Sequence, residues 1–285
     1  MLGGGTVDRL DFTYTGDYNE RLEDGVVEFL TTGVLKFKKE AAIDAFLVGG
    51  GSGGCPGWYR NSSNYGGGGG GGGGKTTTLL NIVPRSNTEY QIIIGAGGSA
   101  GTYSAVNSTV TAPTDGGDTT AFGTTAEGGR VPTVITPGAS LTAGYWGYLI
   151  CGGSGGSGGG QSVGRGITSP FNVAGAGGSD GSDGGASNPQ PSTSTYPIGT
   201  GQGTTTREFG EATGKLYSGG GGAGNILGSP TAGGAGGGGN GGGTAANMNG
   251  VANTGGGGGG QNESGGSTAG AGGSGIVCIR LHKEN

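Results

Sequence analysis

Residues 64–76 read NYGGGGGGGGGKT, with nine consecutive glycines at positions 66–74. Fixing the backbone of one residue costs roughly 1–2 kcal/mol, and glycine loses the most freedom, so ordering this run costs on the order of 10–20 kcal/mol. Glycine has no side chain whose burial would offset that loss. The run is therefore ordered only if its backbone N–H and C=O groups find partners elsewhere in the chain.

Further glycine-rich tracts can supply these partners. A chain in the polyproline-II conformation makes no internal hydrogen bonds and directs its N–H and C=O groups outward, and chains without Cβ atoms approach closely. One such helix alone would be disordered, whereas several can satisfy one another. We therefore expect a bundle of polyglycine-II helices in preference to flexible linkers. The tracts lie at residues 66–74, 152–160, 219–224, 233–243, 255–260 and 265–275.

Short β-rich strings separate the tracts, as in a protein built from strands and connectors. Residues 26–37 (VVEFLTTGVLKF) place two strings around a glycine-containing turn and predict a hairpin. Residues 276–281 (IVCIRL) predict a central strand that pairs with the N-terminal half. The other strings lie at residues 9–14, 43–48, 76–83, 90–94, 119–122, 145–151 and 204–209.

These features predict an all-β fold, namely a β-sandwich with an attached bundle of polyglycine-II helices. Essentially no α-helix is expected, because glycine costs about 1 kcal/mol per helical position relative to alanine. Residues 1–48 are predicted to be an N-terminal β segment that forms part of the sandwich. Residues 49–285 are predicted to be a glycine-rich domain, in which the C-terminal strand 276–282 closes the sandwich.

Composition excludes several classes of function. The chain holds 81 glycines in 285 residues and a formal charge of −5 without a basic cluster, so nucleic-acid binding is not expected. No apolar run approaches the ~18 residues of a membrane helix, and the start lacks a signal-peptide pattern, so we expect synthesis in a host cytoplasm. The three widely spaced cysteines predict buried thiols and neither disulfides nor zinc sites; they are Cys55, Cys151 and Cys278.

Two sequence features resemble a nucleotide-binding or catalytic site, but neither is interpreted as one. Residues 69–76 spell the P-loop pattern G-x-x-x-x-G-K-T, but a working P-loop needs a buried strand before it and a helix after it. The β-branched residues 76–83 predict a strand there. His282 is the only histidine and has no nucleophile partner recognisable from sequence. We expect no enzyme activity, cofactor or metal.

Aromatic residues beside the tracts are the better functional signal, because rigid aromatic side chains on loops make good surface contacts. The segment around Trp58 is interpreted as too irregular for a strand. Packing of its aromatics against the glycine bundle is the alternative. The loop at residues 187–201 is a further candidate for presentation, whereas residues 145–148 are interpreted as strand core. The candidate surface-binding residues are Trp58, Tyr59, Arg60, Tyr65 and Tyr196.

The strings between the tracts carry a family likeness. Residues 46–54 (FLVGGGSGG), 90–98 (YQIIIGAGG), 119–123 (TTAFG) and 273–280 (GSGIVCIR) resemble the glycine-rich domains of phage and prophage tail proteins. The order of elements is also similar to the glycine-rich domain of anaplastic lymphoma kinase, where a tumour-necrosis-factor-like β-sandwich carries polyglycine helices. Polyglycine-bundle adhesins of phage tail fibres resemble it in the same way.

The resemblance implies a structural component of a phage virion, at the tail fibre or tail tip, whose loops bind the host surface. It implies other virion or tail proteins and a host receptor, protein or glycan, as partners, and a homo-oligomer. Two alternatives remain open: a purely architectural virion or filament protein without receptor binding, and an ice-binding protein. An ice-binding protein needs a flat, regular face, which the irregular loops disfavour.

Overall fold

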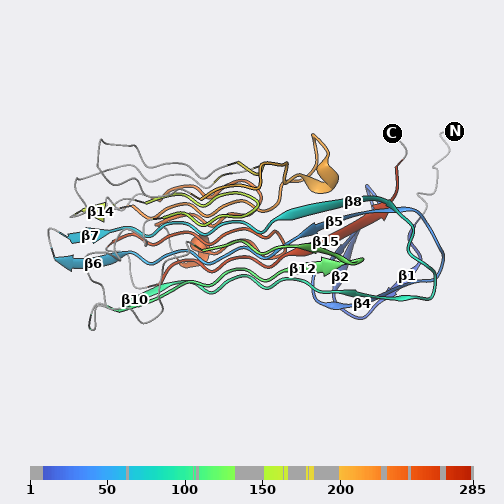
Figure 1. Cartoon of the computed structure of the whole chain (residues 1–285), viewed down its shortest axis with the longest axis horizontal. Helices are drawn as coiled ribbons and strands as arrows, with labels where there is room; N and C mark the ends of the chain where they lie inside the picture. Colours follow the sequence, from blue (N-terminus) through green and yellow to red (C-terminus); the bar gives the residue numbers. More distant parts are fainter. Residues whose placement is uncertain are drawn as a thin grey trace.

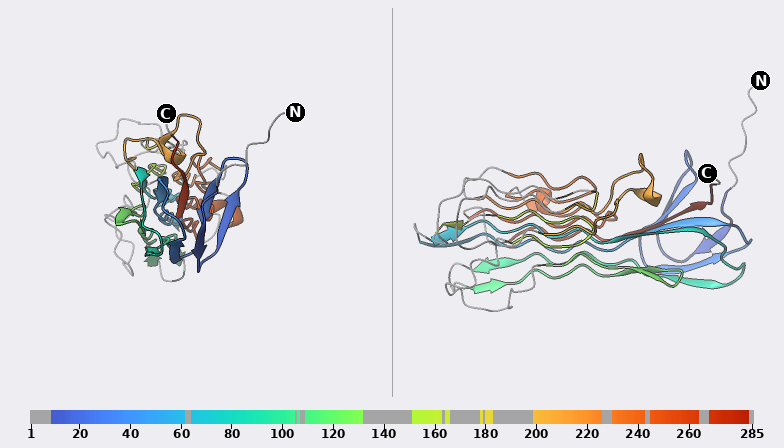
Figure 2. Two further views of the ribbon diagram at one scale, coloured as in Figure 1. Left: turned by 90° about the vertical axis from the view of Figure 1, so that its right-hand side faces the viewer. Right: turned by 45° about the horizontal axis from the view of Figure 1, so that its top comes forward.

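The computed structural model describes residues 9–61, 64–104, 106, 109–131, 151–162, 164–165, 178, 180–182, 199–225, 230–242, 245–263 and 268–283. The molecule is elongated (Figure 1). Its larger sheets gather at one end, and the glycine tracts run side by side along the long axis toward the other end (Figure 2). The fold is all-β, and its sheets are antiparallel.

A five-stranded sheet has the strand order β2-β3-β15-β5-β8. Its central strand is the C-terminal one, which pairs with two strands from the first 48 residues. The predicted pairing of the C-terminal string with the N-terminal half is thus observed, and it fastens the two ends of the glycine-rich region together. The strands are β2 (Tyr18–Arg21), β3 (Val26–Phe29), β5 (Ile43–Val48), β8 (Thr76–Ile82) and β15 (Ile276–Leu281).

A three-stranded sheet faces it, with β1 (Phe12–Tyr14), β4 (Gly33–Phe37) and β9 (Glu89–Ile92) in the order β1-β4-β9. One hydrophobic core joins the inward side chains of both sheets. Its buried members are Val27, Phe29, Leu35, Phe37, Ile43, Ala45, Leu47, Ile92, Ala121, Ala126, Val277 and Ile279. The two sheets therefore share one apolar core.

The predicted hairpin at residues 26–37 is wrong, because its two strands enter different sheets. Strand β3 pairs with β2 and β15, whereas β4 pairs with β1 and β9. Two-residue hairpin turns favour pairs such as Asn-Gly, and Leu30-Thr31-Thr32 offers no such pair. Crossing between the sheets also lets Phe29 and Phe37 bury against the same core from opposite sides.

Segment 206–218 covers the other face of the five-stranded sheet. The predicted string at residues 204–209 is not a continuous strand, because Arg207 forms an isolated bridge with Leu216 and a short 3₁₀ turn, η1 (Glu208–Gly210), follows it. Phe209 and Tyr217 pack against Phe46, with ring centroids 6.1 and 5.4 Å from it. Within the described part of the chain, the one α-helical element is the single turn α2 (Ala245–Met248).

The glycine tracts are joined by backbone hydrogen bonds that repeat every third residue. Residues 70 and 73 donate to residues 160 and 157, and residues 69, 72 and 75 accept from residues 55, 52 and 49. A third neighbour runs antiparallel, and its donor–acceptor pairs are Gly68–Gln261, Gly71–Gly258 and Gly74–Gly255, at 2.7–2.8 Å. Residues 221 and 224 donate in turn to residues 71 and 68, so at least four separate stretches of the chain order the run at 66–74.

Close approach explains why these positions are glycine. A Cβ atom added to Gly71 would lie within 3.0 Å of the backbone of Ser52 and Gly53, closer than real Cβ contacts come. One added to Gly70 would meet the carbonyl of Gly221 in the same way. The neighbouring backbone fills the space that any side chain would need.

Asp44 links β5 to the C-terminal end of β15. It is 1% exposed, and it accepts hydrogen bonds from Arg280 Nε at 3.2 Å and from the Asn81 N–H at 3.1 Å. His282 Nδ1 lies 2.6 Å from Asp44 Oδ1, the same oxygen that accepts from Asn81. Burial alone would raise the pKa of Asp44, but these three partners together lower it below its ordinary value.

The lowered pKa of Asp44 predicts a loss of stability in acid. The unfolded chain binds a proton to this carboxyl at higher pH than the folded chain, so stability is present above pH ~4 and falls as the pH drops through the folded pKa. Asp44→Asn should lower the unfolding free energy by about 2 kcal/mol at pH 7 and flatten this acid dependence. Urea unfolding at pH 7, 4 and 3 measures both effects. Asp11→Asn, which changes an exposed carboxylate, is the control and should leave the acid dependence in place.

Candidate surface-binding site

A small sheet forms the far tip of the molecule, at the end opposite the two larger sheets (Figure 1). Its strands β6 (Trp58–Asn61) and β7 (Asn64–Gly66) form a hairpin, and β14 (Gly164–Arg165) pairs with β7. Beside it lies the two-stranded sheet of β10 (Thr102–Ser104) and β11 (Thr109–Thr111). Extended glycine tracts therefore end in paired strands at this tip.

Tyr59 and Tyr65 form an aromatic pair on the tip hairpin. They are directly opposite in the register, and their rings stack with centroids 6.1 Å apart and planes 24° apart. Tyr59 is 48% exposed and Tyr65 is half-buried. Tyr103 Oη donates to the Tyr59 carbonyl at 2.6 Å, which ties the hairpin to β10. The pair is thus held in place while one ring faces solvent.

Trp58 is not part of this surface, so its assignment to a presented loop is wrong. The segment is strand β6, and Trp58 is 1% exposed. Successive side chains of a strand point to opposite faces, so Tyr59 faces outward when Trp58 faces the bundle. Gly66 lies opposite Trp58, and a Cβ there would come within 2.8 Å of the indole nitrogen. Packing against the glycine bundle, the alternative raised from sequence, is what the structure has.

The other predicted residues are placed less completely. Arg60 lies in β6, but its side chain falls outside the described part of the structure, as does the whole of Tyr196. The aromatic segment 145–148 also lies outside the described residues. Sequence reasoning missed Tyr103 and Val106, the latter 93% exposed after β10. The alternation in Thr102-Tyr103-Ser104 was the available signal for a strand there.

The family description "glycine-rich domain" matches residues 31–282. The chain belongs to this glycine-rich domain family. The match spans the strands of both larger sheets except β1, β2 and β3, together with all the described glycine tracts. No curated protein matches the sequence. Among the described residues, none lies in a helix long and apolar enough to span a membrane.

The P-loop pattern of this glycine-rich domain lacks P-loop geometry. Residues 69–74 are hydrogen-bonded on several sides by neighbouring tracts, and Thr76 begins strand β8 where a P-loop begins a helix. The Lys75 ammonium pairs with Glu127 at 2.7 Å. The sequence match therefore results from a glycine run that happens to precede Lys-Thr.

A buried cluster of Glu28, Glu208 and Cys278 brings three potential metal ligands within 4.8 Å of one another. Its carboxylates are already paired, because Arg21 lies 2.7 Å from Glu208 and 3.6 Å from Glu28. Burial raises the pKa of the Cys278 thiol well above its ordinary value, which keeps it protonated. The cluster is therefore best described as an ion-pair network that fastens segment 206–218 to the sheet. All three cysteines are buried thiols, as the sequence predicted.

Proposed function

We propose that this chain is a structural component of a phage virion, at the tail fibre or tail tip, whose tip loops bind the host surface. Family membership supports the glycine-rich architecture, and the resemblance of the strand strings to phage tail proteins suggests the setting. Other tail proteins would be neighbours, and the host receptor would be a surface protein or glycan. Self-association into a homo-oligomer belongs to the same proposal.

The scaffold in this proposal is a bundle of polyglycine-II helices attached to a tumour-necrosis-factor-like sandwich. Polyproline-II has three residues per turn, so a helix surrounded by others should bond each neighbour at every third residue. The repeating partners of residues 66–74 follow this rule. The shared core of the two larger sheets supports the sandwich. Such a scaffold would hold a hairpin far from its attachment point with little motion.

The observation that carries the binding role is the stacked Tyr59–Tyr65 pair at the tip. Tyrosines supply a large contact area at a low cost in conformational entropy, and they dominate many recognition surfaces. The two tyrosines offer aromatic faces and phenolic hydroxyl groups, so the contacts that this pair can make are aromatic and hydrogen-bonding. That chemistry suits a glycan ring or an aromatic-rich protein surface.

Adsorption of a phage that encodes the chain tests the proposal. Antibody labelling of intact particles should first locate the chain on the tail, and its absence from the virion would end the proposal. Purified wild-type chain should then compete with particles for host cells. The double variant Tyr59→Ala/Tyr65→Ala should compete at least about tenfold less well, as expected when a hot-spot pair is removed.

Leu80→Ala is the matched control, because it removes an exposed apolar side chain, 57% exposed, at the opposite end of the molecule. It should compete like the wild type. Particles that carry the tyrosine double variant, assemble normally and adsorb normally would favour the purely architectural alternative.

A further inference from the structure

Strand β9 is an edge strand that the described part of the chain covers over only part of its length. The hairpin of β12 (Thr119–Ala121) and β13 (Thr124–Ala126) lies beside it. Ile93 and Thr120 exchange two backbone hydrogen bonds of 2.9 Å, N–H to C=O in both directions. The edge of the three-stranded sheet thus accepts an antiparallel partner immediately after β9.

The hairpin then turns away from this edge. Its turn residues Phe122 and Gly123 have φ values of 51° and 73°, which reverse the chain. Backbone N–H and C=O groups alternate between the two sides of a strand, so the groups of Gln91 and Glu89 point to the same side as those of Ile93. That side faces away from β4, which pairs with β9 on the other side. An open stretch of β edge remains where the hairpin stops.

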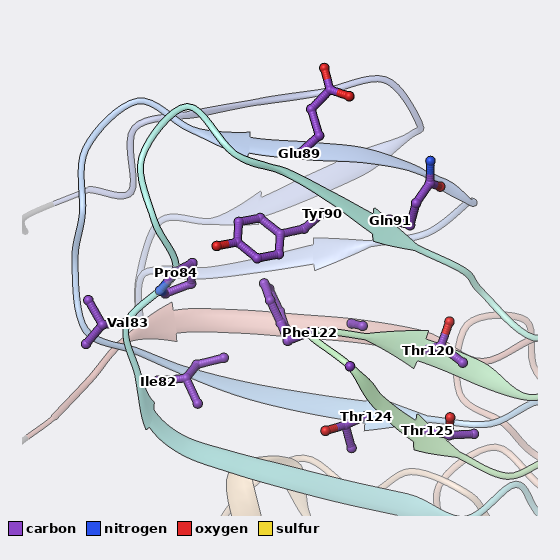
Figure 3. Close-up of a pocket in the computed structure, with 12 residues that line it drawn as sticks. Ile82, Val83, Pro84, Glu89, Tyr90, Gln91, Thr120, Phe122, Thr124 and Thr125 are labelled. Carbon is purple, nitrogen blue, oxygen red and sulfur yellow. The ribbon is translucent and has the colours of Figure 1, made fainter.

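A cavity of about 630 Å³ lies beside this open edge. Figure 3 shows Tyr90 and Phe122 close together above Ile82, with Pro84 beside the tyrosine ring, while Glu89 is directed away. The Tyr90 and Phe122 ring centroids are 5.5 Å apart. Val83, which is 59% exposed, lies at the rim. The cavity therefore offers apolar and aromatic walls next to unpaired backbone groups.

We propose that this groove binds an extended peptide segment of another protein by strand addition to β9. The segment would continue the line of β12, pair with the backbone of Gln91 and Glu89, and insert one apolar side chain between Tyr90, Phe122 and Ile82. An extended peptide can pair its own backbone with the donors and acceptors of β9, which recur every two residues along the edge. The same peptide can place a side chain in the apolar cavity, so this ligand class matches both features. This site lies at the opposite end from the tip hairpin and does not depend on the proposed host binding.

A blocked heptapeptide is the probe, with a central leucine, flanking threonines, terminal glutamines and a fluorescent label. Wild-type chain should bind it saturably in a fluorescence-anisotropy titration. Replacing its leucine with alanine should weaken binding about tenfold or more, because a buried leucine contributes roughly 1.5–3 kcal/mol. N-methylation of the peptide groups that donate to β9 should abolish binding, whereas methylation of the alternate groups should leave it.

Val83→Glu places a charge at the rim of the cavity and should weaken binding about tenfold or more, since burying an unpaired charge is costly. Leu80→Glu is the matched control, because Leu80 is equally exposed, at 57% against 59%, but does not line the cavity. It should bind the peptide like the wild type. Hydrogen exchange should slow at the amides of Gln91 and Glu89 when the peptide is bound.

Three results would overturn the proposal. The first is no saturable binding up to about 1 mM peptide, which corresponds to a free energy near −4 kcal/mol. The second is equal weakening by Val83→Glu and Leu80→Glu. The third is a wild-type dimer that Val83→Glu converts to monomer, because a second copy of the chain would then fill the groove.

Discussion

Replacing Gly71 with alanine is expected to lower the free energy of unfolding by about 3 kcal/mol or more. Gly71 lies inside the tract bundle, where its N–H donates to Gly258 and its carbonyl accepts from Gly221. The new methyl group would overlap the backbone of Ser52 and Gly53, which cannot move without breaking their own hydrogen bonds. Chemical unfolding followed by circular dichroism measures the loss.

Gly123→Asn is the matched control for this substitution. Gly123 has open space around the Cβ position, and asparagine tolerates its φ of 73° better than other residues do. Its unfolding free energy should stay within about 0.5 kcal/mol of the wild type. A Gly71→Ala variant as stable as Gly123→Asn would mean that the tracts are not packed as the hydrogen bonds indicate.

Replacing Arg21 with methionine should destabilise the protein by about 3 kcal/mol, because it removes the cation that pairs with the buried Glu208 and leaves Glu28 with the half-exposed Lys215 at 3.4 Å. Glu28 and Glu208 are 7% and 6% exposed, and Arg21 bridges them from β2. Burial alone would lower the pKa of Arg21, but the hydrogen bond to Glu208 and the nearby carboxylates raise it above its ordinary value. Its charge is therefore kept at any pH where the protein is folded.

Lys38→Met tests whether the burial of the ion pairs causes the loss of stability expected for Arg21→Met. Lys38 pairs with Asp11 at 2.9 Å, and both side chains are about half exposed, so this substitution should change stability by less than about 1 kcal/mol. Urea midpoints for both variants provide the comparison. Equal midpoints would show that segment 206–218 is held by apolar contacts such as Phe209 on Phe46, without a contribution from the ion pairs.

Local sequence predicted the strands that carry β-branched and aromatic residues. Strands β5, β8 and β15 lie where continuous apolar or β-branched strings occur, because those strings fit a sheet in almost any surroundings. It missed several strands of two to four residues, namely β2, β6, β7, β10, β11, β13 and β14. Strands so short are stabilised by pairing with another strand, and the local sequence does not show which strand that will be.

The candidate site was likewise predicted only in part from the sequence, and the tertiary structure decided the rest. Composition alone pointed to the aromatics beside the first glycine tract, and Tyr59 and Tyr65 do lie together on the tip. The burial of Trp58 depended on the register of β6 against β7, which sets the side chain opposite Gly66. One residue of slip would exchange the two faces of the strand, and sequence does not specify the register at that level.

The sequence by itself determined that glycine tracts need one another, because an isolated tract has no side chains to bury and no internal hydrogen bonds. It also determined that the C-terminal string would be a buried strand. Tertiary structure alone decided that β3 and β4 lie in opposite sheets, which side of β6 faces the bundle, and where the β12–β13 hairpin leaves the edge of β9. Each of these outcomes depends on contacts between residues far apart in the chain. The free energy of such contacts cannot be predicted from any single stretch of the sequence.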